Sequence, residues 1–138
     1  MFGYLRKVQY YETDKMGITH HANYIRWMEE ARVAFLESID LPFTSIEEMG
    51  IASPVTGVSV DYKRSCTFGD DVEIAVCIEK YDGVRLEVGY EFKNAHTGEL
   101  IARAHSQHCF LKEGRVCSLK REKLPIHDKL LAASVQGE

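Results

Sequence analysis

Apolar and polar residues alternate along much of the second half of the chain. The segment 84–92 alternates without a break, which is the period-2 pattern of a strand with one buried face. The segment 72–78 alternates in the same way, and Asp82-Gly83 between the two segments is a tight-turn pair that predicts a β-hairpin. Two more strands, each entered through a glycine-containing turn, are expected at 100–111 and 115–119. The pattern therefore predicts an antiparallel meander.

A different period governs the segment 21–39. At about 100° per residue, its large apolar side chains fall in one stripe about 120° wide. The stripe consists of Tyr24, Trp27, Met28, Ala31, Phe35 and Ile39. This pattern predicts one amphipathic helix of about five turns, which Pro42 prevents from continuing.

Two further strands are expected, at 4–10 before the helix and at 55–67 after it. The prediction is therefore a single helix against an antiparallel sheet of about five or six strands. A sheet with one apolar face needs a cover, and the helix stripe is the one large candidate for it.

Length and composition agree with one folded domain over 1–138. The chain has 138 residues, of which 45% are hydrophobic and 28% charged. No internal repeat or linker rich in proline and glycine divides it. We expect the mixed-sign segment 120–123 to face solvent and the last few residues to form a mobile tail.

The charge pattern argues against nucleic acid as a partner, because the formal net charge is -4 and no basic region stands out. The N-terminus has no apolar core of a signal peptide, and the uncharged run 51–60 is far too short to span a membrane. The four cysteines form no C-x-x-C pair, so we expect reduced thiols and a cytoplasmic protein.

The stretch 10–24, between the first strand and the helix, carries the most informative residues. It contains Thr13-Asp14-x-x-Gly17-Ile18-x-x-His21-x-x-Tyr24, followed by Trp27 and Glu30-Ala31-Arg32, and later by Pro54-Val55, Val60-Asp61-Tyr62 and Phe68-Gly69-Asp70. These residues resemble the hotdog-fold acyl-CoA thioesterases, in the 4-hydroxybenzoyl-CoA thioesterase branch and its bacterial relatives associated with the Tol-Pal system. The resemblance covers about residues 4–112. It implies an α+β hotdog fold, in which one long central helix is wrapped by an antiparallel sheet.

The resemblance makes Asp14 the catalytic carboxylate, acting as nucleophile or as general base. A thioester needs little further help, because its thiolate leaving group has a conjugate acid pKa near ~8.5. Asp14 comes just before the helix N-terminus, where the macrodipole and free N–H groups stabilise negative charge. The same N–H groups, that of His21 above all, form the expected oxyanion site, since such a donor is typically worth about 2.7–4 kcal/mol. Residue type alone leaves a second interpretation open, in which Asp14 only caps a turn.

Other side chains near this stretch have implied roles as well. The His21 side chain would position the substrate carbonyl or a water, although a histidine at a helix start can also bond its own backbone. Tyr10 matches a tyrosine that some relatives use in catalysis, and its alternative is a packing role. Tyr24 is an expected substrate-binding residue. Lys63 and Arg64 follow the second strand, where they meet either the CoA phosphates or only solvent.

The histidines do not have the spacing of a metal site. The adjacent pair His20-His21 diverges, while His105 and His108 lie three residues apart on a strand and point to opposite faces. We therefore expect no metal and no other cofactor.

These features predict an acyl-CoA thioesterase that hydrolyses a short-chain or aromatic acyl-CoA to the free acid and CoA. The resemblance implies a homodimer whose sheets join edge to edge, often a homotetramer, with active sites at the subunit boundary; an exposed antiparallel edge needs such protection.

Alternatives within the same fold stay open. One is a dehydratase acting on 3-hydroxyacyl thioesters, and another is a non-catalytic acyl-CoA-binding module. Another branch of hotdog thioesterases carries its catalytic glutamate in the helix. Glu30 lies opposite the apolar stripe and is expected in solvent, whereas Glu29 lies at its flank and remains a candidate.

Overall fold

The computed structural model describes residues 2–136. In chain order the elements are β1 (Phe2–Lys7), η1 (Tyr10–Glu12), α1 (Ala22–Ser38), α2 (Phe43–Glu48), β2 (Ile51–Ala52), β3 (Val55–Tyr62), β4 (Asp71–Tyr81), β5 (Arg85–Asn94), β6 (Leu100–Cys109), β7 (Leu111–Lys112), β8 (Arg115–Val116) and α3 (Pro125–Gln136). Of the tail expected to be mobile, residues 137–138 lie outside the described part.

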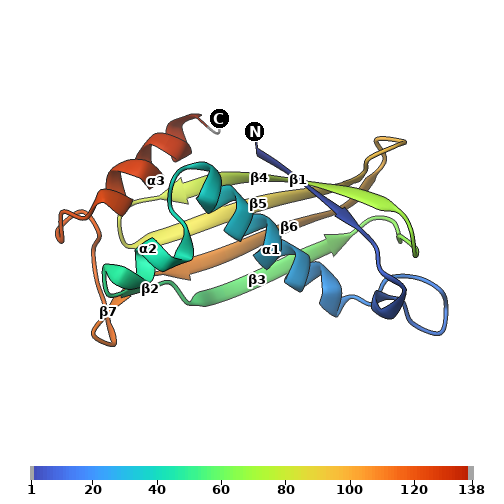
Figure 1. Cartoon of the computed structure of the whole chain (residues 1–138), viewed down its shortest axis with the longest axis horizontal. Coiled ribbons are helices and arrows are strands. Elements are labelled where there is room, and N and C mark those ends of the chain that lie inside the picture. Colours follow the sequence, from blue (N-terminus) through green and yellow to red (C-terminus); the bar gives the residue numbers. More distant parts are fainter. Residues whose placement is uncertain (1, 137–138) are drawn as a thin grey trace.

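Five strands form one sheet in the order β1-β4-β5-β6-β3, and every neighbouring pair is antiparallel. α1 runs across one face of this sheet (Figure 1). The predicted arrangement of one long helix against an antiparallel sheet is confirmed. The three short strands form a second sheet in the order β2-β7-β8.

β4 and β5 form the predicted hairpin around Asp82-Gly83. Asp82 Oδ1 accepts hydrogen bonds from the backbone N–H groups of Arg85 and Val84, at 2.7 and 2.9 Å. These bonds, that from Arg85 first, hold the pKa of the Asp82 carboxyl below its usual value. Gly83 has a φ of +95°, a left-handed conformation that glycine adopts without strain. Turn chemistry and strand alternation therefore specify the same hairpin.

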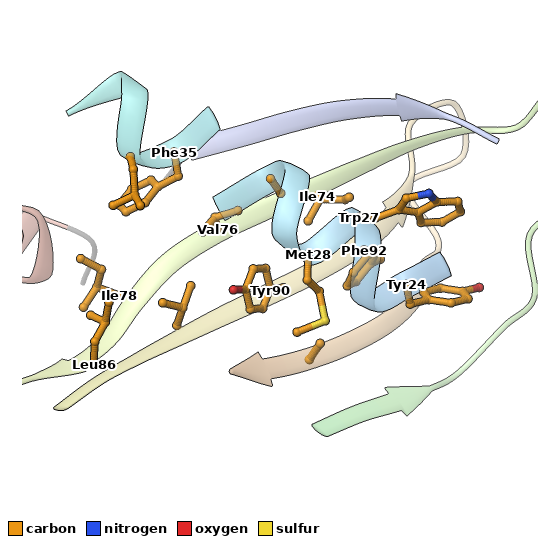
Figure 2. Packing of buried hydrophobic residues seen from close by; sticks show 14 of the residues in the cluster. Tyr24, Trp27, Met28, Phe35, Ile74, Val76, Ile78, Leu86, Tyr90 and Phe92 are labelled. Atoms are coloured by element: carbon orange, nitrogen blue, oxygen red, sulfur yellow. The ribbon is translucent and has the colours of Figure 1, made fainter. Parts of the chain in front are cut away.

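The buried face of α1 contains the predicted stripe from Tyr24 to Phe35, and it also includes Asn23 and Leu36. Ile39, the last residue of the predicted stripe, lies past the end of the helix and is half-buried. Tyr24 and Trp27 are 2% and 0% exposed. The ring of Tyr24 packs edge-on against Phe92 of β5, with ring centres 5.5 Å apart. Figure 2 shows these side chains filling the space between helix and sheet. The packing of this stripe against β4 and β5 holds the start of α1 in place.

Two helices were not expected from the sequence. α2 is short, and α3 follows the segment 120–123 near the end of the chain. α3 packs against β4 through the buried side chains of Ile126 and Leu130, and Tyr81 Oη lies 2.7 Å from His127 Nδ1. No helix within residues 2–136 has the length and apolar character needed to cross a membrane. All four cysteines are free thiols.

The two edges of the main sheet differ in how well they are covered. β1 packs against α1 with every second residue half-buried. β3 is exposed at most positions on both faces, including Val55 and Val58, which are 46% and 41% exposed. The end of β3 carries Tyr62, which contacts the start of α1. β3 is thus an open apolar edge beside the helix N-terminus.

Candidate active site

The segment before α1 is a small hairpin that carries Asp14 near its tip. The His20 N–H donates to Glu12 O at 2.8 Å, Thr13 pairs with Thr19, and the Asp14 N–H donates to Ile18 O at 2.9 Å. The returning arm continues directly into α1 at Ala22. Asp14 and the helix N-terminus are therefore held on one hydrogen-bonded unit.

Asp14 closes the turn at the tip of this hairpin. Its carbonyl accepts from the N–H of Gly17 at 2.9 Å, and Gly17 has a φ of +79°. Its Oδ1 accepts from the Met16 N–H at 2.8 Å. Asp14 is half-buried, and its Oδ2 accepts no hydrogen bond from any described residue. Asp14 thus has the turn-forming contact that residue type predicts and keeps one carboxylate oxygen free.

The first N–H groups of α1 are satisfied locally, whereas that of His21, the residue before the helix, is not. The Ala22 N–H donates to His20 Nδ1 at 3.1 Å, and the N–H groups of Asn23 and Tyr24 donate to the carbonyls of His20 and His21 at 3.0 and 3.1 Å. Within residues 2–136, nothing accepts a hydrogen bond from the His21 N–H. That N–H is therefore the free donor at the helix start. The capping imidazole is that of His20, which the sequence analysis had not singled out.

The His21 side chain is exposed and belongs to a contact with β3. Its ring stacks on Tyr62, with ring centres 4.2 Å apart and an angle of 20° between the planes. The Tyr62 hydroxyl donates to the His21 carbonyl at 3.4 Å, and burial raises the pKa of Tyr62. This contact fixes the helix start next to the open edge of the sheet.

Tyr24 lies in the core, at 2% exposure. Its hydroxyl lies 3.3 Å from Cys66 Sγ, and Thr19 Oγ1 lies 3.1 Å from the same sulfur. Burial raises the pKa of both Tyr24 and Cys66, so both groups stay neutral near neutral pH. Tyr24 therefore packs in the core, and its ring is not accessible to a substrate in the single chain.

Tyr10 lies at the start of η1 and is 75% exposed. Its ring packs edge-on against Phe68, with ring centres 5.6 Å apart. The Tyr10 carbonyl accepts hydrogen bonds from the N–H and hydroxyl of Thr13, at 3.2 and 2.8 Å. The backbone of Tyr10 thereby supports the residue before Asp14, while its ring forms an exposed aromatic surface with Phe68.

Lys63 and Arg64 follow β3 at the surface. Both backbone N–H groups donate to Ile101 O. Lys63 Nζ lies 2.8 Å from Asp61 Oδ2, and Arg64 Nε lies 2.9 Å from Glu99 Oε2. Exposed pairs of this kind contribute about 0–1 kcal/mol, so either cation can exchange its carboxylate for another anion. The two side chains border a surface hollow that Ser65 and Asn94 also line.

Glu12 is a buried charged residue that the sequence analysis missed. It is 4% exposed and forms a two-point ion pair with Arg6, at 2.9 Å for each contact. Arg6 Nε also donates to Glu30 at 3.0 Å. Glu30 was expected in solvent, but it is half-buried and also accepts from the Tyr4 hydroxyl at 2.9 Å. Glu29 is exposed. A non-local partner such as Arg6 leaves no signal in the local pattern around Glu12.

The remaining histidines do not converge. His105 is exposed, with its Nδ1 2.6 Å from Glu79, whereas His108 is buried with its Nε2 2.7 Å from Ser106 Oγ. They point to opposite faces of β6, as their spacing predicts. Among residues 2–136, no three side chains of the types that bind metals gather at one place.

The sequence of this chain is similar to those of known proteins. A match to the thioesterase-like superfamily spans residues 8–133. YneP of Bacillus subtilis, named as a candidate acyl-CoA thioesterase, is 38% identical over 108 residues, which cover 78% of each protein. The 1,4-dihydroxy-2-naphthoyl-CoA hydrolase of Synechococcus is 28% identical over 134 residues, covering 91% of this chain and 96% of that protein.

Solved structures give the same result. The structure of DHNA-CoA thioesterase from Staphylococcus aureus matches with a TM-score of 0.89 at 30% identity, and the match covers 99% of this chain and 94% of that one. The family match covers most of the chain and includes both the hairpin with Asp14 and the start of α1. The chain therefore belongs to the thioesterase-like superfamily and has the hotdog fold.

Proposed function

We propose that the chain hydrolyses an acyl-CoA thioester to the free acid and CoA, with Asp14 as the catalytic carboxylate and the His21 N–H as the oxyanion donor. One observation carries the proposal: Asp14 Oδ2 and the His21 N–H are both without hydrogen-bond partners among residues 2–136, and one hairpin carries them. Acyl transfer needs a nucleophile or base and a hydrogen-bond donor for the oxyanion, held in a fixed arrangement. The free carboxylate oxygen and the free N–H group on this hairpin can supply both.

In the proposed reaction, the thioester carbonyl oxygen accepts a hydrogen bond from the His21 N–H, which stabilises the charge that develops as the carbon becomes tetrahedral. Asp14 then acts by one of two routes. As nucleophile, its oxygen bonds to the carbonyl carbon, the C–S bond breaks with its electron pair on sulfur, and water cleaves the resulting anhydride. As general base, it takes a proton from water while the water oxygen bonds to that carbon and the C–S bond breaks.

Single-turnover hydrolysis in ¹⁸O-labelled water separates the two routes. In the base route, the label enters the product acid at the first turnover. Label in the Asp14 carboxylate is expected only for the anhydride route, when water attacks the aspartyl carbon of the anhydride. Mass spectrometry of the Asp14 peptide measures this directly.

The proposed acyl group is short or aromatic. The exposed rings of Tyr10 and Phe68 offer an apolar surface beside the hairpin. We propose that Tyr10 contacts the acyl group there, in place of the catalytic role that the resemblance implies. The Synechococcus relative is named for an aromatic acyl-CoA, which supports the same choice. Lys63 and Arg64 are proposed to bind the CoA phosphates, which are stronger partners than their exposed carboxylates.

The proposed functional unit is a homodimer, with a homotetramer as its larger form. An open antiparallel edge such as β3 is suited to pairing with a second sheet. Because Tyr62 of β3 touches His21, a second copy paired there would cover the free side of the site. The four free thiols fit the reducing cytoplasm, where we place the reaction.

Thiol release measured with a chromogenic disulfide tests the function on a panel of short-chain, long-chain and aromatic acyl-CoAs. We expect enzyme-dependent release of one thiol per acyl-CoA, fastest with short-chain or aromatic acyl groups. A dehydratase would instead change enoyl absorbance with no thiol released. Tight acyl-CoA binding without thiol release over hours would contradict the proposal and favour a binding module.

A further inference from the structure

Glu12 is the one buried carboxylate among residues 2–136, and all of its bonding capacity is used. Oε1 accepts from Arg6 Nη1 at 2.9 Å and from the Gln9 N–H at 2.8 Å. Oε2 accepts from Arg6 Nη2 at 2.9 Å and from Trp27 Nε1 at 2.7 Å. The side chain thus joins β1, the segment before the hairpin, and α1. A carboxylate is rarely buried this completely unless its partners are fixed.

The backbone of the same residue holds the start of the helix. Glu12 O accepts from the His20 N–H at 2.8 Å and from Asn23 Nδ2 at 2.9 Å. The His20 carbonyl accepts from both the N–H and the Nδ2 of Asn23, at 3.0 and 3.3 Å. Because the His20 carbonyl and the His21 N–H belong to one planar peptide group, these bonds fix the direction of the His21 N–H.

We propose that Arg6, Glu12, Asn23 and Trp27 act as a positioning unit, the Glu12 clamp, that sets the Asp14 carboxylate and the His21 N–H relative to each other. Glu12 stands two residues before Asp14 at the base of the hairpin, and its carbonyl bonds the residue before His21. This inference rests on the proposed function, because it assigns a role in that same reaction. Glu12 is a positioning residue, since its carboxylate is covered by its four donors.

A purely structural role of Glu12 and a positioning role of Glu12 predict different effects of its substitution. A purely structural role lowers the melting temperature and leaves the turnover of the folded enzyme unchanged. A positioning role lowers kcat with KM nearly constant, because misplacing reacting groups by about 1 Å can cost about 10²-fold in rate.

Glu12→Gln tests the clamp directly. Glutamine keeps the shape but turns one acceptor into a donor, so whichever oxygen is replaced leaves two donors without an acceptor. We expect kcat to fall about 10²-fold and KM to change less than about twofold, at a temperature where circular dichroism shows the variant folded.

Glu30→Gln is the matched control. It makes the same chemical change at the other carboxylate bonded to Arg6, but among residues 2–136 that carboxylate has no hydrogen bond to the hairpin or to Asn23. Its kcat should stay within about twofold of wild type. Equal losses in the two variants, or a Glu12→Gln enzyme with normal kcat and only a lower melting temperature, would overturn the proposal.

If Glu12→Gln does not fold, Trp27→Phe replaces it, because this change removes a single donor to Oε2. A lower kcat at constant KM supports the clamp, and an unchanged kcat overturns it. Asp14→Asn separates the two proposals. If Asp14→Asn is fully active, the proposed function fails. If Asp14→Asn is impaired while Glu12→Gln turns over normally, only the clamp fails.

Discussion

Adjacent residues at the start of α1 have different roles that residue type does not reveal. The His20 ring caps the helix through the Ala22 N–H, whereas the His21 ring stacks on Tyr62. The N–H groups of Ala22, Asn23 and Tyr24 have acceptors, whereas no residue among 2–136 accepts a hydrogen bond from the His21 N–H. The proposed oxyanion site is therefore one backbone group, whose position depends on residues that never touch the substrate.

His108 shows how burial alone changes the chemistry of one residue. It is 3% exposed, and burial, with a smaller effect of the Arg32 charge, lowers its pKa from 6.5 to about 4. The folded state therefore keeps His108 neutral at pH values where the unfolded chain becomes protonated. The stability that depends on this neutral form is complete above about pH 6.5 and is lost as the pH falls toward about 4.

We predict that His108→Gln makes folding less sensitive to acid. Through this residue, the wild type loses about 2 kcal/mol of unfolding free energy between pH 7 and pH 5, whereas glutamine does not titrate. Urea unfolding at both pH values measures the difference. His96→Gln, at an exposed histidine, is the control and should leave this part of the pH dependence unchanged. Equal pH dependence in His108→Gln and wild type would contradict the account.

Of the two helices that the sequence did not predict, α3 is the longer. It covers the sheet beyond the end of α1 (Figure 1), with Leu130 buried at 2% exposure and Leu131 beside it at 44%. We predict that Leu130→Ala lowers the unfolding free energy by about 2–5 kcal/mol. The turnover of the folded fraction should not change, because α3 lies at the other end of the molecule from the hairpin that carries Asp14 (Figure 1).

Urea unfolding and thiol-release assays on the same preparations check this prediction. Leu131→Ala is the control, since it removes the same atoms from an exposed position and should cost less than about 1 kcal/mol. If both variants unfold at the same urea concentration, α3 is not part of the cooperative core.

Local patterns explain which elements were predictable. The hairpin of β4 and β5 and the helix α1 repeat their apolar residues at the period of their own structure, so the sequence predicts both. α2 has only six residues, too few to show a period. α3 begins at Pro125, and proline is favourable as the first residue of a helix. The packing of α3 against β4 joins segments that are far apart in the sequence, so no local pattern predicts it.

The candidate site also has parts that the sequence predicts and parts that it does not. The roles of Asp14 and of the His21 N–H were predicted from the motif and its resemblance to known thioesterases, and they stay predictions. The hairpin that carries Asp14 was not predicted, because the sequence indicated only a loop there. The Glu12 clamp could not be predicted, because Arg6 and Trp27 approach Glu12 only after β1 and α1 have packed together. A glutamate in a polar segment otherwise indicates a solvated side chain.

At the scale of the whole molecule, a single chain does not explain why the edge strand β3 exposes apolar side chains. Its exposed apolar residues and unpaired backbone edge lie beside the helix start. We predict that Val58→Lys weakens self-association, because pairing at this edge would bring two new positive charges close together. A monomeric variant should also lose activity, since the second copy is proposed to cover the site.

Sedimentation velocity measures the oligomeric state, and thiol release on the same sample measures activity. Leu5→Lys makes a comparable change on β1, the opposite edge of the sheet, where Leu5 is 63% exposed, and should alter neither property. A wild-type monomer with full activity, or dissociation by Leu5→Lys alone, would contradict the assignment of β3.

Whether the Asp14 carboxylate performs the reaction is decided by the kcat/KM of Asp14→Asn. The measurement uses a short-chain and an aromatic acyl-CoA, with Asp128→Asn as a control for the same change at an exposed position on α3. We predict a loss of about 10²–10⁴-fold for Asp14→Asn and no loss for the control. An Asp14→Asn enzyme that keeps most of the wild-type kcat/KM with both substrates would mean that Asp14 is not the catalytic carboxylate.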